Sequence, residues 1–382
     1  MLFAQLVIKN LRRRLARTAM TILGLAVAVT ATTTLWNIAW GYAGSAKDFY
    51  AQRGVDIVVV RAGVANRLTS NLPAALADRI KSVPGVAGVD GSLTEMVSVG
   101  KALLIGIPLR GVSPGGFIVE TLAVKPGRSL RSDDRGVVMI GNGLAATLRK
   151  QPGDSIDVEG KHFKIVGIVE AANPFDSNCI FATVDDVRTL MGRQQTFSEF
   201  QVKAAKTVRD DAALREICQA IEALRDDQHQ PLGLKAQPTH QFVSTATETK
   251  LGGATAWAIT AIVVALSFAS ILNTMLMSVI ERTQELGILR AIGWRRSRVL
   301  RMILSESAVI SLVAALVGIL LSWVLVQILS SWSRTSLLVP ETLSTAALLP
   351  GFAVAIIAGI SGALYPALHA ASVPPIESLR YE

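Results

Sequence analysis

Residues 281–300 read ERTQELGILRAIGWRRSRVL and lie between two long apolar segments. The stretch is too charged to cross a bilayer and too short to form a domain. Leu286, Leu289 and Ile292 recur at helical spacing and would face the bilayer or a groove on another protein. A compact charged helix at a membrane surface is typical of a site that another protein grips. We therefore expect a membrane subunit on which a partner acts from the cytoplasm.

Four apolar segments are long enough to span a hydrocarbon core, which needs about 20 mostly apolar residues. The chain has 382 residues, of which 51% are hydrophobic, and its mean hydropathy is +0.43. These values are high for a soluble protein and low for a fully embedded one, so we predict a mixed architecture. The predicted transmembrane helices are residues 18–40, 254–280, 302–329 and 346–368.

The excess of basic residues lies next to the predicted spans. Residues 1–17 carry five Lys or Arg and no acidic residue, and residues 281–301 carry six Arg against two Glu. Residues 41–250 are nearly balanced, with 25 basic and 23 acidic residues. The net charge of +9 therefore reflects the positive-inside rule and is no nucleic-acid footprint. We expect the N-terminus and the 281–301 loop in the cytoplasm and residues 41–250 outside.

The remaining segments follow from this topology. Residues 1–17 have apolar side chains at helical spacing and predict an amphipathic helix on the inner leaflet; a basic flank that only sets orientation is the alternative. The first span is expected to be an uncleaved anchor, because its apolar run is longer than that of a signal peptide. Residues 330–345 are predicted to be an outer loop and residues 369–382 a cytoplasmic tail.

The outer region, residues 41–250, is large enough to have its own core. Val86–Val99 is strand-like, Leu72, Leu76, Ile80 and Val83 indicate one helix, and Leu214–Leu224 marks the face of another. The middle is rich in Gly, Val and Ile with Pro-Gly turn signals, which favours strands. We predict a split α/β part at 51–100 and 195–240, with an inserted mostly-β part at 101–194.

Several motifs along the chain match one family. They are ERTQELGILRAIG at Glu281–Gly293, PGRSL at Pro126–Leu130, VVMIGNGLAATL at Val137–Leu148, GDSIDVEGKHFKIVGI at Gly153–Ile168 and PPIESLRYE at residues 374–382. Together with the order of one span, an outer domain and three spans, they cover nearly the whole chain. The chain resembles the permease subunits of MacB/FtsX-like ABC transporters, which are of the mechanotransmission type.

The resemblance implies a fold class and a set of partners. The fold is an α-helical membrane protein with four transmembrane helices plus an extracytoplasmic α/β domain that contains an inserted mostly-β subdomain. Two permease copies, identical or different, would pair in a bacterial inner membrane, and ABC ATPase subunits would dock on their cytoplasmic loops. ATP and magnesium would be bound by the partner ATPase, and this chain would bind no cofactor. A periplasmic adaptor or substrate protein is a further candidate partner.

The resemblance also implies which residues couple the chain to the ATPase: Glu281, Arg282, Glu285, Leu286, Gly287, Leu289, Arg290 and Gly293. The physics of the loop supports this role. Glu281 and Glu285 are one helical turn apart and can orient docking on a complementary surface. Gly293 is well placed to end the helix in a left-handed conformation. The alternative is a solvated loop whose arginines only enforce orientation.

Polar residues within the predicted spans are also candidates for a function. Asn273 and Thr274 could form hydrogen bonds across a helix interface. Glu306 lies about one turn beyond the arginine-rich loop and could pair with Arg298 or Arg301. We expect packing and dimer roles for these three residues, because so few polar residues argue against a hydrophilic channel.

No catalytic or metal site is predicted. The sequence contains no G-x-x-x-x-G-K-[ST] phosphate loop, so we expect the ATPase on a separate polypeptide. The four histidines lack the spacing of metal ligands. Cys179 and Cys218 are both predicted outside, either as one disulfide or as two buried thiols.

We thus expect a non-catalytic permease subunit that couples ATP hydrolysis to motion of the outer domain. Export or extraction of a hydrophobic or amphiphilic substrate fits best. The main alternative is an FtsX-like signalling subunit, which activates an extracytoplasmic enzyme and transports nothing.

Overall fold

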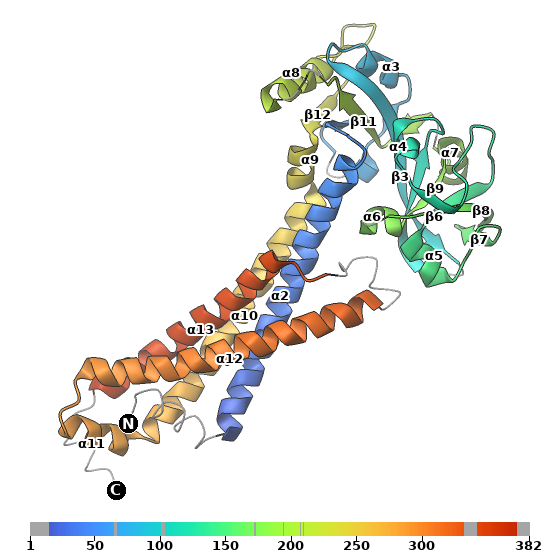
Figure 1. Ribbon diagram of the computed structural model, residues 1–382. Coiled ribbons are helices and arrows are strands. Elements are labelled where there is room, and N and C mark those ends of the chain that lie inside the picture. The colour runs from blue at the N-terminus through green and yellow to red at the C-terminus, as the bar shows by residue number, and fades with distance from the viewer. Residues whose placement is uncertain are drawn as a thin grey trace. The chain divides into compact units, whose positions relative to one another are not determined.

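We describe a computed structural model of the chain (Figure 1). The structure describes residues 15–64, 67–100, 104–171, 173–193, 195–206, 208, 210–331 and 342–372. Most of the predicted N-terminal helix, most of the outer loop at 330–345 and the motif at 374–382 lie outside these ranges. The chain divides into two compact units. The membrane unit is Met1–Gly41, Gly252–Ser331 and Val339–Glu382, and the outer unit is Tyr42–Leu251 with Trp332–Leu338.

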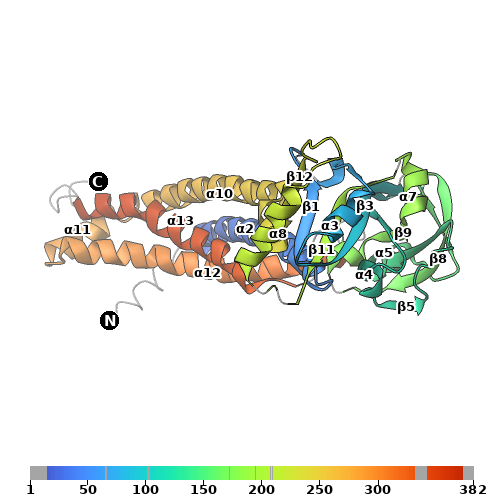
Figure 2. The same ribbon diagram turned by 90° about the horizontal axis from the view of Figure 1, so that it is seen from above.

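Four helices of the described residues are long and apolar enough to cross a membrane, which confirms the predicted number of spans. They are α2 (Leu15–Ala51), α10 (Thr247–Ile280), α12 (Arg296–Ser331) and α13 (Thr345–Ser372). The short helix α11 (Thr283–Ala291) connects α10 to α12. In both views α12 and α13 lie side by side within the membrane unit (Figures 1 and 2).

Small residues allow the helices of the membrane unit to approach closely. A Cβ atom on Gly318 of α12 would lie 2.6 Å from Cβ of Val29 and 2.7 Å from the carbonyl oxygen of Ala26, both on α2. Gly362 of α13 packs against Ile271 of α10 in the same way, with 2.9 Å to its Cβ. Helices associate in lipid through such close contacts, because burial of apolar surface provides no driving force for association there.

Hydrogen bonds between spans accompany this packing. The hydroxyls of Thr34 and Ser322 are 2.9 Å apart, and the indole N–H of Trp36 donates to Thr260 at 3.1 Å. The hydroxyl of Ser307 donates to the carbonyl oxygen of Gly359 at 2.7 Å. These groups satisfy one another away from water, which lowers the cost of having them in a membrane span.

The outer unit is built on a mixed sheet in which β3 links two parts. One part has the order β12-β1-β11-β3, and the other continues β3-β4-β9-β6-β8-β5, with β7 beside β3 and β8. Strands β2 and β10 form a separate pair. The strands are β1 (Ile57–Arg61), β2 (Leu72–Pro73), β3 (Val86–Val99), β4 (Leu104–Val112), β5 (Val124–Gly127), β6 (Val137–Gly141), β7 (Ser155–Val158), β8 (Lys161–Val169), β9 (Ile180–Thr183), β10 (Thr196–Phe197), β11 (Glu199–Ala204) and β12 (Leu234–Pro238).

Short helices connect these strands. They are η1 (Arg67–Thr69), α3 (Leu76–Lys81), α4 (Phe117–Glu120), α5 (Asn142–Leu148), α6 (Pro174–Ser177), α7 (Val184–Met191), α8 (Asp211–Glu222) and α9 (Thr239–Thr245). Helices α3 and α8 pack on the first part of the sheet, and α5 and α7 pack on the second. The result confirms the predicted α/β domain with a mostly-β insertion. The main core joins Ile57, Leu93, Ile140 and Phe200 from both parts.

The local predictions within this unit succeeded to different degrees. Strand β3 has the bounds that the sequence pattern indicated. The helix predicted from Leu72 to Val83 was wrong at its start, because Leu72 lies in β2 and pairs with Phe197. Pro73 and the pairing of a fully buried Leu72 favour an extended backbone there, so the helix begins only at Leu76.

Candidate functional site

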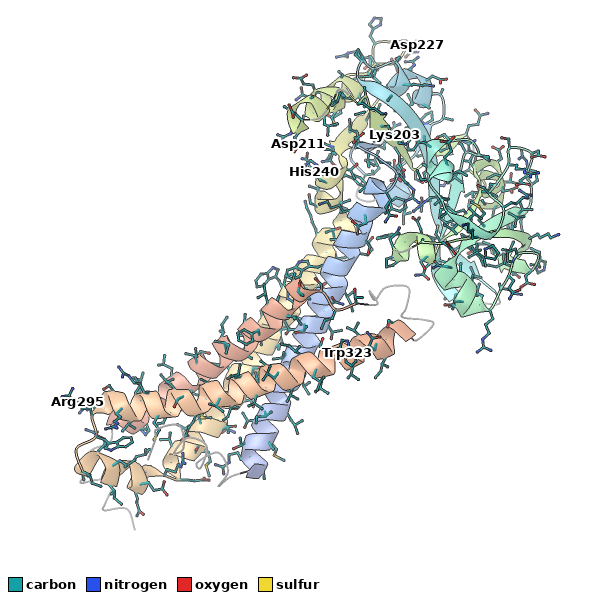
Figure 3. All side chains as sticks on the ribbon, viewed as in Figure 1. Lys203, Asp211, Asp227, His240, Arg295 and Trp323 are labelled. Carbon is teal, nitrogen blue, oxygen red and sulfur yellow. The ribbon has the colours of Figure 1, made fainter. Side chains whose placement is uncertain are left out.

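The charged stretch that follows the second span forms a helical hairpin. Helix α10 ends at Ile280, α11 runs over Thr283–Ala291, and α12 starts at Arg296. Gly293 has φ of +101°, the left-handed conformation that the sequence predicted for it. Its N–H donates to the carbonyl oxygen of Arg290, and the next N–H, of Trp294, donates to that of Leu289. These bonds end α11 and turn the chain towards α12; Arg295 lies at this turn (Figure 3).

One face of α11 packs into the membrane unit. Leu286 is buried, and Leu289 is half-buried, in a cluster with Val279, Met302 and other residues of α10, α12 and α13. Gly287 is buried on the same helix. From the sequence we expected the side chains of Leu286 and Leu289 to face the bilayer or a groove on a partner. This orientation was wrong, because the two side chains complete the helix packing of their own unit.

The exposed side of α11 carries one large apolar side chain, and a second follows at the C-cap of the helix. Ile288 is 48% exposed and Ile292 is 74% exposed, one helical turn apart. The side chain of Glu285 beside them is 58% exposed. Large exposed apolar side chains that are flanked by charge mark sites of protein contact. Sequence reasoning noted Ile292 but missed Ile288, although its spacing of four residues from Ile292 could have indicated it.

A shielded ion pair fixes the start of α11. Arg282 donates from Nη1 to both carboxylate oxygens of Glu306, at 3.2 and 3.1 Å. The side chains of Arg282 and Glu306 are only 11% and 6% exposed. Glu306 therefore pairs with Arg282 and not with the predicted Arg298 or Arg301, since it faces the hairpin from α12. The outer partner of Arg282, Glu285, is more distant at 3.9 Å.

Two further contacts tie the hairpin to α2 and α13. Arg17 donates to both carboxylate oxygens of Glu281, at 3.0 and 2.8 Å. This pair is partly exposed, with side chains 35% and 27% accessible. Arg290 donates to the carbonyl oxygen of Ala371, in the last turn of α13, at 2.9 Å. The hairpin is thus bonded to three spanning helices.

The two other polar candidates in the spans differ in their surroundings. Thr274 accepts a hydrogen bond from Thr21 of α2 at 3.2 Å and donates to the carbonyl oxygen of Ser270 at 2.9 Å. Asn273 is exposed on the adjacent side of α10. Thr274 therefore joins two helices of one chain, whereas Asn273 faces away from them.

The outer unit contains a buried charge cluster that sequence reasoning missed. Asp176 accepts from Arg53 at 2.8 Å and from Arg110 at 3.2 Å, and all three side chains are at most 4% exposed. Burial lowers the pKa of the Arg53 guanidinium, although the Asp176 carboxylate opposes this shift. The three residues are far apart in the sequence and form no motif, so no sequence signal could have joined them.

The described residues offer no group of three or more His, Cys, Asp or Glu side chains that could hold a metal ion. Cys179 and Cys218 are both buried, and the structure shows no disulfide between them. Burial, with the nearby Glu222 carboxylate, raises the pKa of Cys218 to about 12. The Cys218 thiol is thus neutral, and the candidate site is the hairpin at α11.

Comparison with known proteins gives two family matches. Residues 257–375 match the FtsX-like permease C-terminal family, and residues 18–220 match the MacB-like periplasmic core domain. The second match alone covers more than half of the chain.

Individual relatives agree with these matches. An uncharacterized ABC transporter permease of Methanocaldococcus jannaschii is 25% identical over 98% of this chain and 96% of its own. The macrolide export ATP-binding/permease protein MacB of Bdellovibrio bacteriovorus is 25% identical over 96% of this chain, which spans 59% of that protein. The solved periplasmic region of MacB from Actinobacillus actinomycetemcomitans covers 50% of this chain with 18% identity and a TM-score of 0.39; 94% of that region is matched.

Proposed function

Because the chain belongs to the MacB/FtsX-like family of ABC transporter permeases, we propose that an ABC ATPase displaces α11 and that α11 transmits this displacement to the outer domain. The chain is a membrane protein with a large extracytoplasmic domain. We place it in a bacterial inner membrane, with ATP and magnesium bound by an ATPase that residues 1–382 do not contain. The chain itself then acts as a non-catalytic coupling subunit.

The observation that carries this proposal is the two-sided character of α11. Its inner face is held by Leu286 in the core and by the Arg282–Glu306 pair. Its outer face presents Ile288 and Ile292 to the surroundings. A helix that is fixed on one side and apolar on the other can be pressed by a partner and transmit the displacement. If α11 were only a solvated loop, two exposed isoleucines beside a carboxylate would not be expected.

A second permease copy is expected to pack against α10. The most apolar stretch of α10 is 22% buried within the chain, whereas the corresponding stretches of α2, α12 and α13 are 39% to 44% buried. Asn273 lies on the exposed side of this helix. An amide is costly in contact with lipid and favours a hydrogen-bonding partner on another helix. Pairing two copies through α10 would supply one.

The proposed activity is export or extraction of a hydrophobic or amphiphilic substrate that is handled on the outer side. Polar side chains of the spans, such as Thr34, Ser322 and Trp36, bond between helices, so we do not expect a hydrophilic path through the membrane unit. An FtsX-like role, in which motion of the outer domain activates another protein, is the competing outcome. Stimulation of ATP hydrolysis by small amphiphiles favours transport, and a stable complex with an outer protein favours signalling.

The proposal is tested by co-purifying the tagged chain with its ATPase from native membranes. Ile292→Glu should reduce the ATPase recovered by about 10- to 100-fold, since burying one isoleucine contributes about 1.5–3 kcal/mol. Glu285→Arg should uncouple ATP hydrolysis from function while the chain still folds. Ile105→Glu is the matched control, because Ile105 is equally exposed, at 77%, in the outer unit. Unchanged recovery and coupling in both α11 variants would refute docking at α11.

A further inference from the structure

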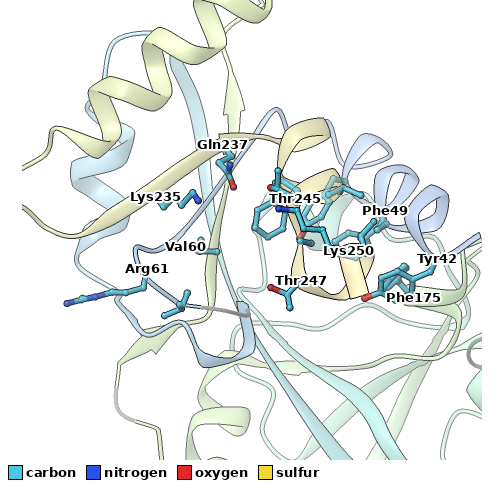
Figure 4. A pocket seen from close by; sticks show the side chains of 17 residues that line it. Tyr42, Phe49, Val60, Arg61, Phe175, Lys235, Gln237, Thr245, Thr247 and Lys250 are labelled. Atoms are coloured by element: carbon cyan, nitrogen blue, oxygen red, sulfur yellow. Dashed lines mark hydrogen bonds between the residues drawn. The ribbon is translucent and has the colours of Figure 1, made fainter. Parts of the chain in front are cut away.

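The outer unit contains a cavity of about 330 Å³ that the proposed coupling does not use. Its walls are the last turns of α2, the ends of β1 and β12, helices α6 and α9, and the start of α10 (Figure 4). This volume is at the lower end of the range for small-molecule sites. All lining residues belong to the outer unit.

One wall of the cavity is aromatic. The rings of Tyr42 and Phe175 are 5.0 Å apart, and those of Phe49 and Phe175 are 6.1 Å apart. Tyr50 and Phe242 lie edge to face at 6.0 Å. These five side chains, of which Tyr42, Phe49 and Phe175 are labelled in Figure 4, give the cavity a broad apolar surface. Such a surface accommodates an acyl chain or a flat ring system.

The aromatic wall is held rigidly from behind. The guanidinium carbons of Arg53 and Arg110 lie 3.9 and 4.2 Å from the centre of the Phe49 ring. Both guanidiniums are fixed by the buried Asp176 carboxylate. On the neighbouring ring, the Tyr50 hydroxyl donates to Glu199 at 3.0 Å. The cavity is thus preformed, which lowers the entropy cost of binding a ligand.

Two lysines, Lys235 of β12 and Lys250 of α10, also line the cavity. Both are exposed, and neither side chain forms an ion pair with a carboxylate of the described residues. Arg61 stands at the rim, and its side chain extends away from the cavity (Figure 4). The hydroxyl oxygen of Thr249 is buried in this region and has no hydrogen-bond partner among the described residues. A buried hydroxyl without a partner is costly, so a ligand oxygen would satisfy it.

We propose that this cavity binds an anionic amphiphile, with its acyl or aryl body on the aromatic wall and its carboxylate or phosphate at Lys235, Lys250 and Thr249. A neutral apolar ligand would leave the Thr249 hydroxyl without a partner and would gain no attraction from the two exposed ammonium groups, and a cation would be repelled. The inference rests on the proposed function, because it names the chemical class of the amphiphilic substrate.

The position of these residues in the chain fits such a ligand. Tyr42 follows the end of the predicted span at Trp40 by two residues, and Lys250 precedes the predicted span at Ala254 by four. Both walls therefore lie only a few residues along the chain from a predicted span. The anion could come from a membrane phospholipid or from a free amphiphilic acid, which share this chemistry.

The test uses the full chain in phosphatidylcholine nanodiscs without any ATPase. A diazirine-bearing hexadecanoate and the matching diazirine-bearing hexadecylamine are photolysed separately, and labelled peptides are mapped by mass spectrometry. The acid should label residues 42–50 and 242–250 about five- to tenfold more than the amine does. Equal labelling by the two probes, or labelling confined to the lipid-facing surface of the spans, would overturn the proposal.

Charge reversal gives the second readout. Lys235→Glu with Lys250→Glu should remove the preference for the acid, whereas Lys161→Glu with Lys164→Glu should keep it, since both control lysines are exposed on β8. An unchanged preference in the first variant, at an unaltered melting temperature, would refute the assignment.

A last arm replaces part of the lipid with phosphatidylglycerol. Reduced labelling by the acid supports the site with lipid as its source, and unchanged labelling supports it with a free acid. Because no ATPase is present, a failure here leaves the coupling proposal intact, and a failure of docking at Ile292 leaves this binding intact.

Discussion

The ion pair between Arg282 and Glu306 offers the sharpest test of how the hairpin is held. Replacing Glu306 by Gln removes the negative charge and keeps the shape of the side chain. Arg282 would then lose its nearer carboxylate and keep the more distant Glu285, at 3.9 Å, at a position where its side chain is only 11% exposed. We expect this change to loosen α11 and to leave the outer unit unaffected, because the pair lies within the membrane unit.

The size of the effect follows from burial. Removing one partner of a buried ion pair costs about 3–5 kcal/mol, and the residual exposure here favours the lower end, about 3 kcal/mol. Opening of α11 separates the pair, so its opening free energy should fall by a similar amount. That corresponds to about 100-fold faster hydrogen exchange of the α11 amides, such as the Leu286 N–H, which donates to the backbone carbonyl oxygen of Arg282. Exchange is measured by mass spectrometry on the full chain in nanodiscs.

Two variants serve as controls. Arg282→Met combined with Glu306→Leu removes both charges and should restore exchange to near the wild-type rate. Glu281→Gln weakens the partly exposed pair with Arg17 and should change the rate by less than about fivefold. The reasoning fails if Glu306→Gln leaves exchange within about twofold of wild type, or if the double variant exchanges as fast as the single one.

Three other predictions concern packing, titration and thiols. Gly318→Ala should destabilise the membrane unit by about 1–3 kcal/mol, seen as a lower melting temperature, whereas Gly24→Ala should not, because a Cβ at Gly24 meets nothing within 4 Å. Burial raises the pKa of Asp90 above its ordinary 3.8, so wild type should lose stability as the pH rises through that raised pKa. Asp90→Asn should remove the contribution of this carboxyl to the change in melting temperature between acid and neutral pH. Cys218, with its pKa raised to about 12, should resist iodoacetamide at pH 8 until the protein is unfolded, and rapid labelling of the native chain would contradict its burial.

The sequence predicted those parts of the fold that depend on local pattern. The bounds of β3 follow from a run of β-branched and small residues, and the four spans follow from length and hydropathy. The helix predicted from Leu72 failed because pairing with Phe197 outweighs helical spacing over so few residues. The order of the strands in the sheet could not be predicted from the sequence either. It depends on contacts between distant segments, such as β1 between β11 and β12.

The candidate site was predictable in position but not in orientation. The sequence indicated α11 and the left-handed Gly293, because both follow from local patterns. It could not show that Leu286 faces inward and Ile288 outward, since both are apolar and the packing of α12 and α13 decides between them. The partner of Glu306 was missed for a related reason. Arg282 and Glu306 are 24 residues apart and meet only because the hairpin packs the start of α12 against the end of α10.

The unequal strength of the bonds at α11 indicates how a displacement would travel in the proposed mechanism. The partly exposed Arg17–Glu281 pair contributes about 0–1 kcal/mol and is easily separated, and Arg290 donates a hydrogen bond to the carbonyl oxygen of Ala371 in α13. The shielded Arg282–Glu306 pair is the firmest of the three connections. Movement of α11 should therefore be followed first by α12. From there the close packing of α12 on α13 carries it further, because packed helices with glycine contacts move as one body more readily than they separate.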